Sequence, residues 1–202
     1  MDWREKYERA AARYEAGEGR AHDERQLVQL ANAAWAAGLC LLMLDDRAAS
    51  REWLLRAAER YRESWDAGAP PDAWGRPIAA MKALLIADNA CDKLSLAAFW
   101  ALDAGAAEAD SAIGRYAGTV ALLVLGRNEE ATQVAATLAE PFPADVAAAL
   151  RALAAGDGEA FAVAVADVRQ SYEERVGYLE DLPVADTALA LEALSRIARV
   201  GP

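Results

Sequence analysis

Apolar side chains recur at intervals of three and four residues along most of the chain. Leu54, Ala58, Tyr61 and Trp65 follow this spacing, which places them on one face of a helix. A longer series of the same kind runs over residues 161–179. Alanine, leucine, glutamate and arginine dominate the sequence, and all four favour helix. No stretch alternates apolar and polar residues for long enough to indicate a strand, so we predict an all-α fold.

Capping residues and chain breakers divide this pattern into separate helices. Asp2 with Glu5, and Asp23 with Gln26, have the spacing of a capping box, in which side chains satisfy free amides at a helix start. We predict about ten helices, near residues 2–16, 23–44, 47–67, 74–88, 90–104, 111–125, 127–139, 143–155, 157–179 and 182–199. Their short connections favour antiparallel αα-hairpins.

Three segments share one local pattern: LLMLDDRAAS (41–50), LLIADNACDK (84–93) and LLVLGRNEEA (122–131). Each has a leucine pair, two small or apolar residues, an Asp or Gly break and a renewed helix. ALAAGDGEAF (152–161) repeats the break in shorter form. We therefore predict hairpin turns near 45–47, 88–90, 126–128 and 156–158. Gly126 and Gly156 suit C-caps that need a positive φ, and Asn128 and Asp157 suit the following N-caps.

Longer loops alternate with these tight turns. DAGAPPDAWGR (66–76) and DAGAAEADSAIGR (103–115) precede the second and third copies, and both end in Gly-Arg. Gly38 and Gly118 fall at matching places inside their helices. A glycine there costs roughly 1 kcal/mol relative to alanine, so we expect it to permit close helix–helix approach. These features fit a single all-helical domain over residues 1–202.

This arrangement resembles the tetratricopeptide-like superfamily of helical repeats. The resemblance rests on the paired helices, the turn GRNEEA (126–131), the small residues at helix crossings and the aromatic Tyr61, and it covers most of residues 23–179. It implies an array of hairpins in a right-handed superhelix, but no activity. The repeats lack the regular length of standard tetratricopeptides. The segments FAVAVADVRQSYEERV (161–176) and PVADTALALEALSR (183–196) also resemble the ends of all-α bacterial immunity proteins.

Composition narrows the classes of partner. The chain has 202 residues and a formal net charge of -11, which disfavours nucleic acid and acidic membrane surfaces. Apolar runs such as 39–44 are too short to span a bilayer. We see no secretory signal pattern, and the two cysteines, Cys40 and Cys91, are best explained as buried free thiols. A cytoplasmic location is therefore expected.

The sequence indicates no catalytic site, no metal site and no cofactor. The single histidine, His22, lies in a polar stretch before a helix start and has no paired nucleophile. Asp45 and Asp46 lack the third acidic residue that a metal site would need at helical spacing, and a hairpin turn explains them. None of the common nucleotide-binding, metalloprotease or serine-hydrolase motifs is present.

Two features suggest a binding surface. Arg76 and Arg115 both open a helix, where the helix dipole opposes a cation. Each could pair with an acid of the preceding loop, such as Asp72 or Asp110, or could form an arginine rim that binds a partner's carboxylate. Trp74, beside the Pro-Pro loop, is the best candidate for an exposed binding aromatic.

We therefore expect a non-enzymatic helical repeat module that binds a protein or peptide. The candidate binding residues are Trp74, Arg76, Lys82, Arg115, Tyr116, Arg56 and Arg60. One alternative is a toxin-neutralising immunity-type protein, whose acidic surface would cover a basic toxin site. Another is an enzyme or small-ligand carrier with a pocket between helices, formed for example by Arg115, Tyr116 and Asp186. The oligomeric state is left open, a homodimer included.

Overall fold

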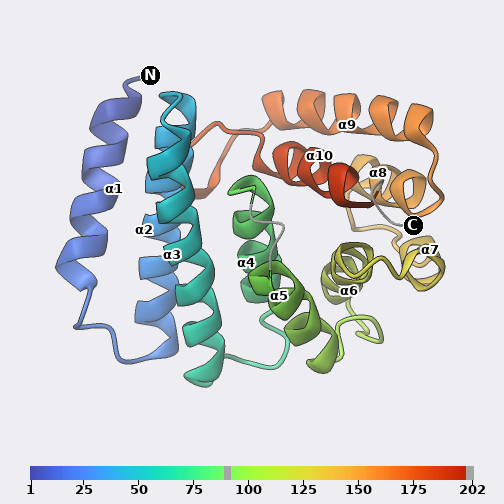
Figure 1. Cartoon of the computed structure of the whole chain (residues 1–202), viewed down its shortest axis with the longest axis horizontal. Coiled ribbons are helices and arrows are strands. Elements are labelled where there is room, and N and C mark those ends of the chain that lie inside the picture. Colours follow the sequence, from blue (N-terminus) through green and yellow to red (C-terminus); the bar gives the residue numbers. More distant parts are fainter. Residues whose placement is uncertain (89–91, 199–202) are drawn as a thin grey trace. The chain divides into compact units, whose positions relative to one another are not determined.

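The computed structural model describes residues 1–88 and 92–198 of the chain. In these ranges it contains ten α-helices, one short 3-10 helix and no strand, so the all-α prediction is confirmed (Figure 1). Most predicted helix ends lie within two residues of the observed ones. The larger differences lie near residues 136, 173 and 186. Cys91 and residues 89–90 of the predicted turn near 88–90 lie outside the described residues.

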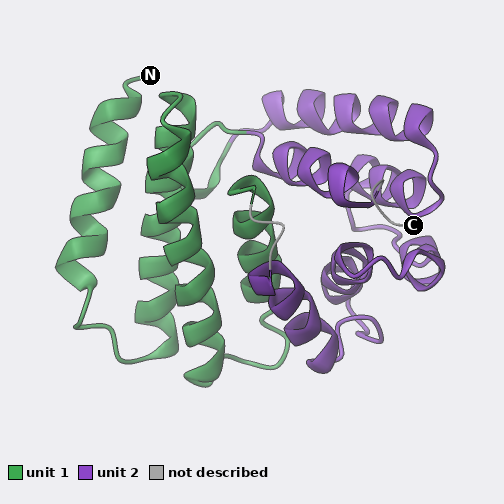
Figure 2. Ribbon diagram, in the orientation of Figure 1, with its two compact units in different colours: residues 1–89, 177–184 green, residues 90–176, 185–202 purple. Residues whose placement is uncertain are grey.

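The chain divides into two compact units (Figure 2). Unit 1 consists of residues 1–89 and 177–184, and unit 2 consists of residues 90–176 and 185–202. Unit 1 contains α1 (Trp3–Gly17), α2 (Glu24–Met43), α3 (Arg47–Asp66), α4 (Gly75–Ile86) and the 3-10 helix η1 (Leu179–Asp181). Unit 2 contains α5 (Asp92–Asp103), α6 (Ala112–Val124), α7 (Asn128–Ala136), α8 (Ala144–Ala154), α9 (Gly158–Glu173) and α10 (Asp186–Ala198).

Successive helices of unit 1 pack against each other. Helix α2 contacts both α1 and α3, and α3 contacts α4; α1, α2 and α3 run antiparallel (Figure 1). At the crossing of α2 and α3, a Cβ atom on Gly38 would lie 2.7 Å from Cγ of Leu54. The Ser50 hydroxyl donates a hydrogen bond of 2.8 Å to the carbonyl of Gly38. The expectation that Gly38 permits close helix packing is therefore confirmed.

Unit 2 continues the same scheme and adds a closing helix. Contacts link α5 to α6, α6 to α7, α7 to α8 and α8 to α9, while α10 packs on α6, α8 and α9. Gly118 lies inside α6, but its close neighbour is a loop: an added Cβ would lie 2.6 Å from Cα of Ala107. The expectation of a helix–helix crossing at Gly118 is wrong, because the loop after α5 folds over α6 at that point.

The four aligned segments share one backbone feature. Their fifth residues all have positive φ: 60° at Asp45, 53° at Asp88, 70° at Gly126 and 71° at Gly156. At three of them the same pair of hydrogen bonds closes the turn, as for Asp45 N to Leu42 O and the next amide to Leu41 O, both near 3 Å. This is the Schellman arrangement, which satisfies carbonyls at a helix end. The predicted turns at 45–47, 126–128 and 156–158 are confirmed.

Side chains cap several of the predicted helix starts. Asp2, Asp23, Asp46 and Asp157 each accept a backbone amide of the first turn through their carboxylates. Asn128 is an exception to the prediction, because it is already the first residue of α7 and Arg127 occupies the cap position. Helix α7 therefore begins without a side-chain cap, and the Schellman turn fixes its entry instead.

Helix α2 is, at 20 residues, long and apolar enough to cross a membrane by composition alone. Its length is not evident from uninterrupted apolar runs, because Gln29 and Asn32 divide the apolar stretch without adding charge. In this structure 67% of its most apolar window is buried. Its buried residues include Trp35 and Cys40, so α2 is the central helix of unit 1.

The longest predicted helix, 157–179, is too long, because α9 ends at Glu173. Val176 and Leu179 continue the apolar spacing of the sequence, but Val176 is fully exposed and Leu179 is 55% exposed. No burial of these two side chains offsets the entropy cost of extending the helix. Leu182 and Val184 are buried instead, which holds residues 177–184 as part of unit 1.

Candidate binding groove between α1 and α2

Helix α1 carries its basic residues on one face. Lys6, Arg9 and Arg13 follow the spacing of three and four residues that aligns side chains along a helix. Glu8 and Glu15 fall on the opposite face by the same geometry. In a chain with a net charge of -11 this face is locally basic, and of its three cations Arg9 is paired with Glu5 of the preceding turn at 2.8 Å.

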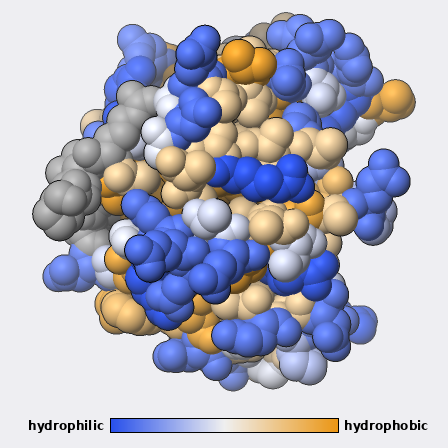
Figure 3. Space-filling view, turned by 90° about the vertical axis from the view of Figure 1, so that its right-hand side faces the viewer, coloured by the Kyte–Doolittle hydropathy of each residue, from blue (hydrophilic) through white to orange (hydrophobic). Residues whose placement is uncertain are grey.

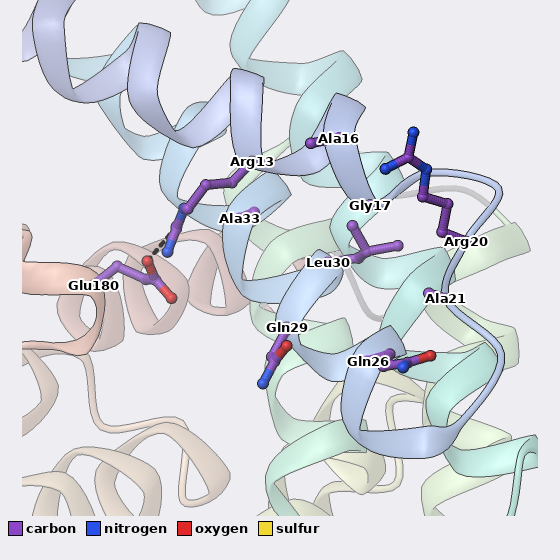
Figure 4. A pocket seen from close by; sticks show the side chains of 10 residues that line it. All are labelled: Arg13, Ala16, Gly17, Arg20, Ala21, Gln26, Gln29, Leu30, Ala33 and Glu180. Carbon is purple, nitrogen blue, oxygen red and sulfur yellow. Dashed lines mark hydrogen bonds and ion pairs between the residues drawn. The ribbon is translucent and has the colours of Figure 1, made fainter.

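A groove of about 600 Å³ lies beside this face, between α1 and α2 (Figure 4). Small and apolar side chains form most of its lining, with Leu30 and Ala33 from α2 opposite Ala16 and Gly17 from α1. The polar lining residues are Arg13, Arg20, Gln26, Gln29 and Glu180. The groove thus combines an apolar floor with hydrogen-bonding groups at its edges.

Small residues create this space and fix its depth. Ala16, Ala21 and Ala33 line the groove with methyl groups only. At Gly17 the two helices approach so closely that an added Cβ would lie 2.6 Å from Cδ2 of Leu30. The groove therefore depends on small side chains where α1 ends, since a larger residue at position 17 would collide with α2.

An ion pair divides the groove from a smaller hollow. Arg13 on α1 binds the carboxylate of Glu180 in η1 (Figure 4). A second hollow of about 220 Å³ lies on the other side of this pair, and Lys6, Arg9, Arg13 and Glu180 all line it. The Lys6 ammonium donates a hydrogen bond of 3.0 Å to the backbone carbonyl of Asp181. Two basic residues of α1 thus hold η1.

Arg20 lies at the far end of the groove (Figure 4). Within residues 1–88 and 92–198, the Arg20 guanidinium has no ion pair and no hydrogen bond. It extends from the loop that follows α1 (Figure 4). Arg20 is exposed, so it is accessible to an anion at the groove's edge.

Aromatic side chains fix α1 from its other side. The ring of Trp53 on α3 contacts Tyr7 and Tyr14 of α1 edge-to-face, with centroid distances of 6.3 Å and 5.3 Å. Burial raises the pKa of Tyr14, and the neighbouring Arg60 partly offsets this rise. Such contacts favour a fixed position of α1, so the groove is formed before any ligand binds.

Two of the predicted site residues, Arg56 and Arg60, belong to this aromatic support. The Arg56 guanidinium lies 4.7 Å from the centroid of Trp53. Arg60 donates hydrogen bonds to Tyr14 at 3.1 Å and to Glu63 at 2.6 Å, and also pairs with Glu18. These partners of both arginines lie within unit 1.

The prediction of an exposed Trp74 is wrong. Its side chain is only 8% exposed, and its ring centroid lies 6.2 Å from that of Trp65. Arg76 follows it and binds Glu24 of α2 at 2.5 Å, with a further bond to Ser64 at 3.3 Å. The residue is paired internally, as one interpretation held, but with Glu24 rather than Asp72.

Lys82 also contacts the interior of unit 1. Its ammonium lies 5.6 Å from the ring centroid of Trp35, a fully buried residue of α2. A cation at this distance interacts favourably with the ring face. Lys82 lies about two turns further along α4 than Arg76, which binds Glu24 near the start of that helix.

In unit 2, Arg115 donates hydrogen bonds to backbone carbonyls of Ala109 at 3.0 Å and Asp110 at 2.7 Å. The expected carboxylate pair with Asp110 is wrong, because the loop carbonyls take its place. Tyr116 is buried against Phe142, with ring centroids 5.4 Å apart. Burial raises the pKa of Tyr116, and the negative charge of Asp186 adds to this effect. The structure brings Tyr116 near Asp186 and turns Arg115 to the loop.

Other chemistry is sparse in the described ranges. No group of three or more metal-ligating side chains occurs within them. His22 is exposed, as expected for a surface loop. Cys40 is a free, fully buried thiol whose pKa is raised to about 11 by burial. On the face drawn in Figure 3, hydrophilic side chains lie among mostly weakly hydrophobic ones.

The groove residues were not among those selected from the sequence. The spacing of Lys6, Arg9 and Arg13 was a usable signal, because it places three cations on one face of a predicted helix. Glu180 gave no such signal. It contacts Arg13, which lies 167 positions away in the sequence, and only the tertiary structure brings the two together.

Comparison with known proteins gives no relative for this chain. No family model matches it, and no curated protein or solved structure shows significant similarity to it.

Proposed function

We propose that this protein is a non-enzymatic module that binds a peptide segment of another protein in the groove between α1 and α2. The observation that carries the proposal is the groove itself: about 600 Å³, an apolar floor and polar groups at the edges. Ligand pockets in proteins commonly measure 300–1,000 Å³ and have this division between apolar lining and a few polar groups.

The size and lining favour a peptide side chain as the occupant. Leu30 and Ala33 form a buried floor, and the more exposed Ala16 and Ala21 offer apolar contact at the sides. Burying a ligand side chain the size of leucine contributes roughly 1.5–3 kcal/mol. Gln29 and Gln26 also line the groove and can bond to peptide amides and carbonyls. This combination suits a short segment that places one apolar residue in the groove and its backbone along the edge.

The wider architecture supports the same class of function. Consecutive helices pair within each unit, which agrees with a tetratricopeptide-like array of hairpins, a common scaffold for peptide binding. The net charge of -11 favours a protein partner over nucleic acid or an acidic membrane. The free buried thiol of Cys40 fits the reducing cytoplasm, which we propose as the location.

A filled groove tests the proposal. Ala16 lies on α1, is exposed and lines the groove, so Ala16→Trp should occupy it without disturbing the core. Ala166 is also an exposed helical alanine, lies on α9 and lines none of the hollows described, so Ala166→Trp is the matched control. Random twelve-residue peptides displayed on phage are selected on the unmodified full-length chain.

Selected peptides should bind the unmodified chain and the Ala166→Trp control equally well. They should lose at least tenfold in affinity for Ala16→Trp, measured by fluorescence anisotropy, while circular dichroism shows both variants folded. Selection of no peptide, or of peptides that bind Ala16→Trp undiminished, would rule out this groove as the binding site.

A further inference from the structure

Residues 177–184, here called the strap, lie against the basic face of α1 within unit 1. Two consecutive strap residues, Glu180 and Asp181, adopt positive φ values of 57° and 55°. This conformation costs roughly 1–2 kcal/mol for each non-glycine residue. Burial of Leu182 and the bonds to Lys6 and Arg13 hold the strap in this position.

The strap places one carboxylate where the groove and the smaller hollow meet. Glu180 and Arg13 line both hollows, so their ion pair separates them. Without this side chain, Lys6, Arg9 and Arg13 would face one continuous channel that runs on to Arg20. Glu180 thus has the position that an acidic side chain of a bound peptide would take.

We propose that the groove selects an acidic peptide segment of a partner protein, and that Glu180 occupies the place of that segment's carboxylate in the free protein. This inference rests on the proposed function of the groove. Charge complementarity supports it: the charged lining residues outside the strap are all basic, whereas the chain as a whole carries -11. They are Lys6, Arg9, Arg13 and Arg20, and the acidic lining residues Glu180 and Asp181 both belong to the strap. Such a surface attracts acidic segments locally and leaves basic ones to other faces.

The positions of the two groove arginines suggest the form of the peptide. Arg13 extends from α1 beside Glu180, and Arg20 extends from the loop after α1 at the other end of the groove (Figure 4). The preferred segment therefore combines acidic residues, which face these arginines, with an apolar residue that faces Leu30.

Tethering makes the strap a strong competitor. A linked group can act at an effective concentration in the millimolar range, so Glu180 should weaken the binding of any free acidic peptide. Removing its charge should therefore increase affinity, whereas removing the charge of Arg13 should decrease it. A site in which Glu180 had only a structural role would not give the first result.

The test measures peptide binding to full-length Glu180→Gln and to two companion variants. The probe is a fluorescein-labelled, blocked peptide with the strap sequence Tyr-Leu-Glu-Asp-Leu, compared with the same peptide in which Gln and Asn replace the acids. Glu8→Gln is the matched control, because Glu8 is an exposed glutamate on the opposite face of α1 and its loss changes the net charge equally.

The acidic probe should bind Glu180→Gln at least tenfold more tightly than the unmodified chain or Glu8→Gln. Arg13→Gln and Arg20→Gln, made in the Glu180→Gln background, should each reverse most of that gain, and the amide probe should bind weakly to every variant. Arg20 has no side-chain contact to lose, so Arg20→Gln is also made in the unmodified chain, where it should weaken binding of the acidic probe even if changes at position 180 reduce folding.

Equal affinity of the acidic and amide probes, or no gain in Glu180→Gln, would overturn the inference. If phage-selected peptides bind in the groove but carry no acidic residues, this inference is also overturned, whereas the proposed function stands. If no selected peptide depends on the groove at all, both proposals fail.

Discussion

At position 45 the chain holds an aspartate in the left-handed conformation that glycine holds at positions 126 and 156. Asp45→Gly should raise the free energy of unfolding by about 1 kcal/mol, because glycine adopts this conformation without steric cost. The pair that Asp45 forms with Arg47, at 3.7 Å, is highly exposed and contributes little. Urea denaturation measures the change.

Gly126→Ala is the reciprocal test and should lower the free energy of unfolding by about 1 kcal/mol. An added Cβ there has no neighbour within 4 Å, so the cost comes from the backbone alone. A destabilised Asp45→Gly protein, or an unchanged Gly126→Ala protein, would contradict the equivalence of these turns.

Burial of Cys40 also predicts a response to alkaline pH. Its pKa is raised from 9.0 to about 11, so the thiol stays protonated in the folded protein where the unfolded chain already ionises. The folded state therefore loses stability as pH rises from about 9 to 11, by about 2 kcal/mol from this residue. The fall in the urea midpoint between pH 8 and pH 11 should be smaller in Cys40→Ala than in the unmodified protein. Identical pH dependence in both proteins would show that the thiol does not contribute.

At the scale of the helices, two glycines inside helices lie in close contacts. An alanine at Gly118 would meet the backbone of Ala107 at 2.6 Å, whereas at Gly38 it would meet the side chain of Leu54 at 2.7 Å. Both substitutions should destabilise, by about 1–3 kcal/mol, and Gly118→Ala more than Gly38→Ala because a backbone yields less than a side chain.

Gly75→Ala serves as the control for this pair. It is the first residue of α4, and nothing lies within 4 Å of an added Cβ. Helix propensity and reduced chain entropy should make it neutral or stabilising by up to about 1 kcal/mol. Thermal unfolding followed by circular dichroism ranks the three variants, and a Gly118→Ala protein as stable as Gly75→Ala would refute the packing argument.

Helices and turns were predictable because their causes are local. Apolar spacing, aspartate caps and the Asp or Gly break at the fifth position depend on neighbours within a few residues. The end of α9 was not predictable in this way. Val176 and Leu179 keep the helical spacing, and only the tertiary structure reveals that both are exposed.

The candidate site was less accessible to sequence reasoning. Arginines at helix starts, such as Arg76, were candidate binding residues because the helix dipole opposes a cation there. Their partners turned out to be internal, as with Glu24. The groove instead requires small residues on two helices and a carboxylate from residue 180, and no single segment carries that combination.

At the scale of the whole molecule, unit 1 is discontinuous in the sequence. Residues 90–176 of unit 2 separate its four helices from the strap that completes it. Leu182 anchors the strap, being 3% exposed, and lines the smaller hollow with Ala10 and Ala36. Leu182→Ala should cost about 2–4 kcal/mol by removing buried volume. The loss should fall on unit 1, because the strap belongs to its core.

Hydrogen exchange followed by mass spectrometry locates that loss. Amides of α1 should exchange faster in Leu182→Ala, while those of α6 and α8 should keep their protection. Equal loss of protection in all these helices would mean that the two units unfold as one. Unchanged protection of α1 would mean that the strap does not stabilise it.

The interruption of unit 1 also sets an order of events during protein synthesis. Helices α1 to α4 leave the ribosome before residues 90–176 have been made, and the strap follows only after them. At about 5–20 residues per second, this interval is on the order of ten seconds. During that time Arg13 has no Glu180 to bind, so the nascent chain carries a groove open to acidic segments, including those of molecular chaperones, before its own carboxylate arrives.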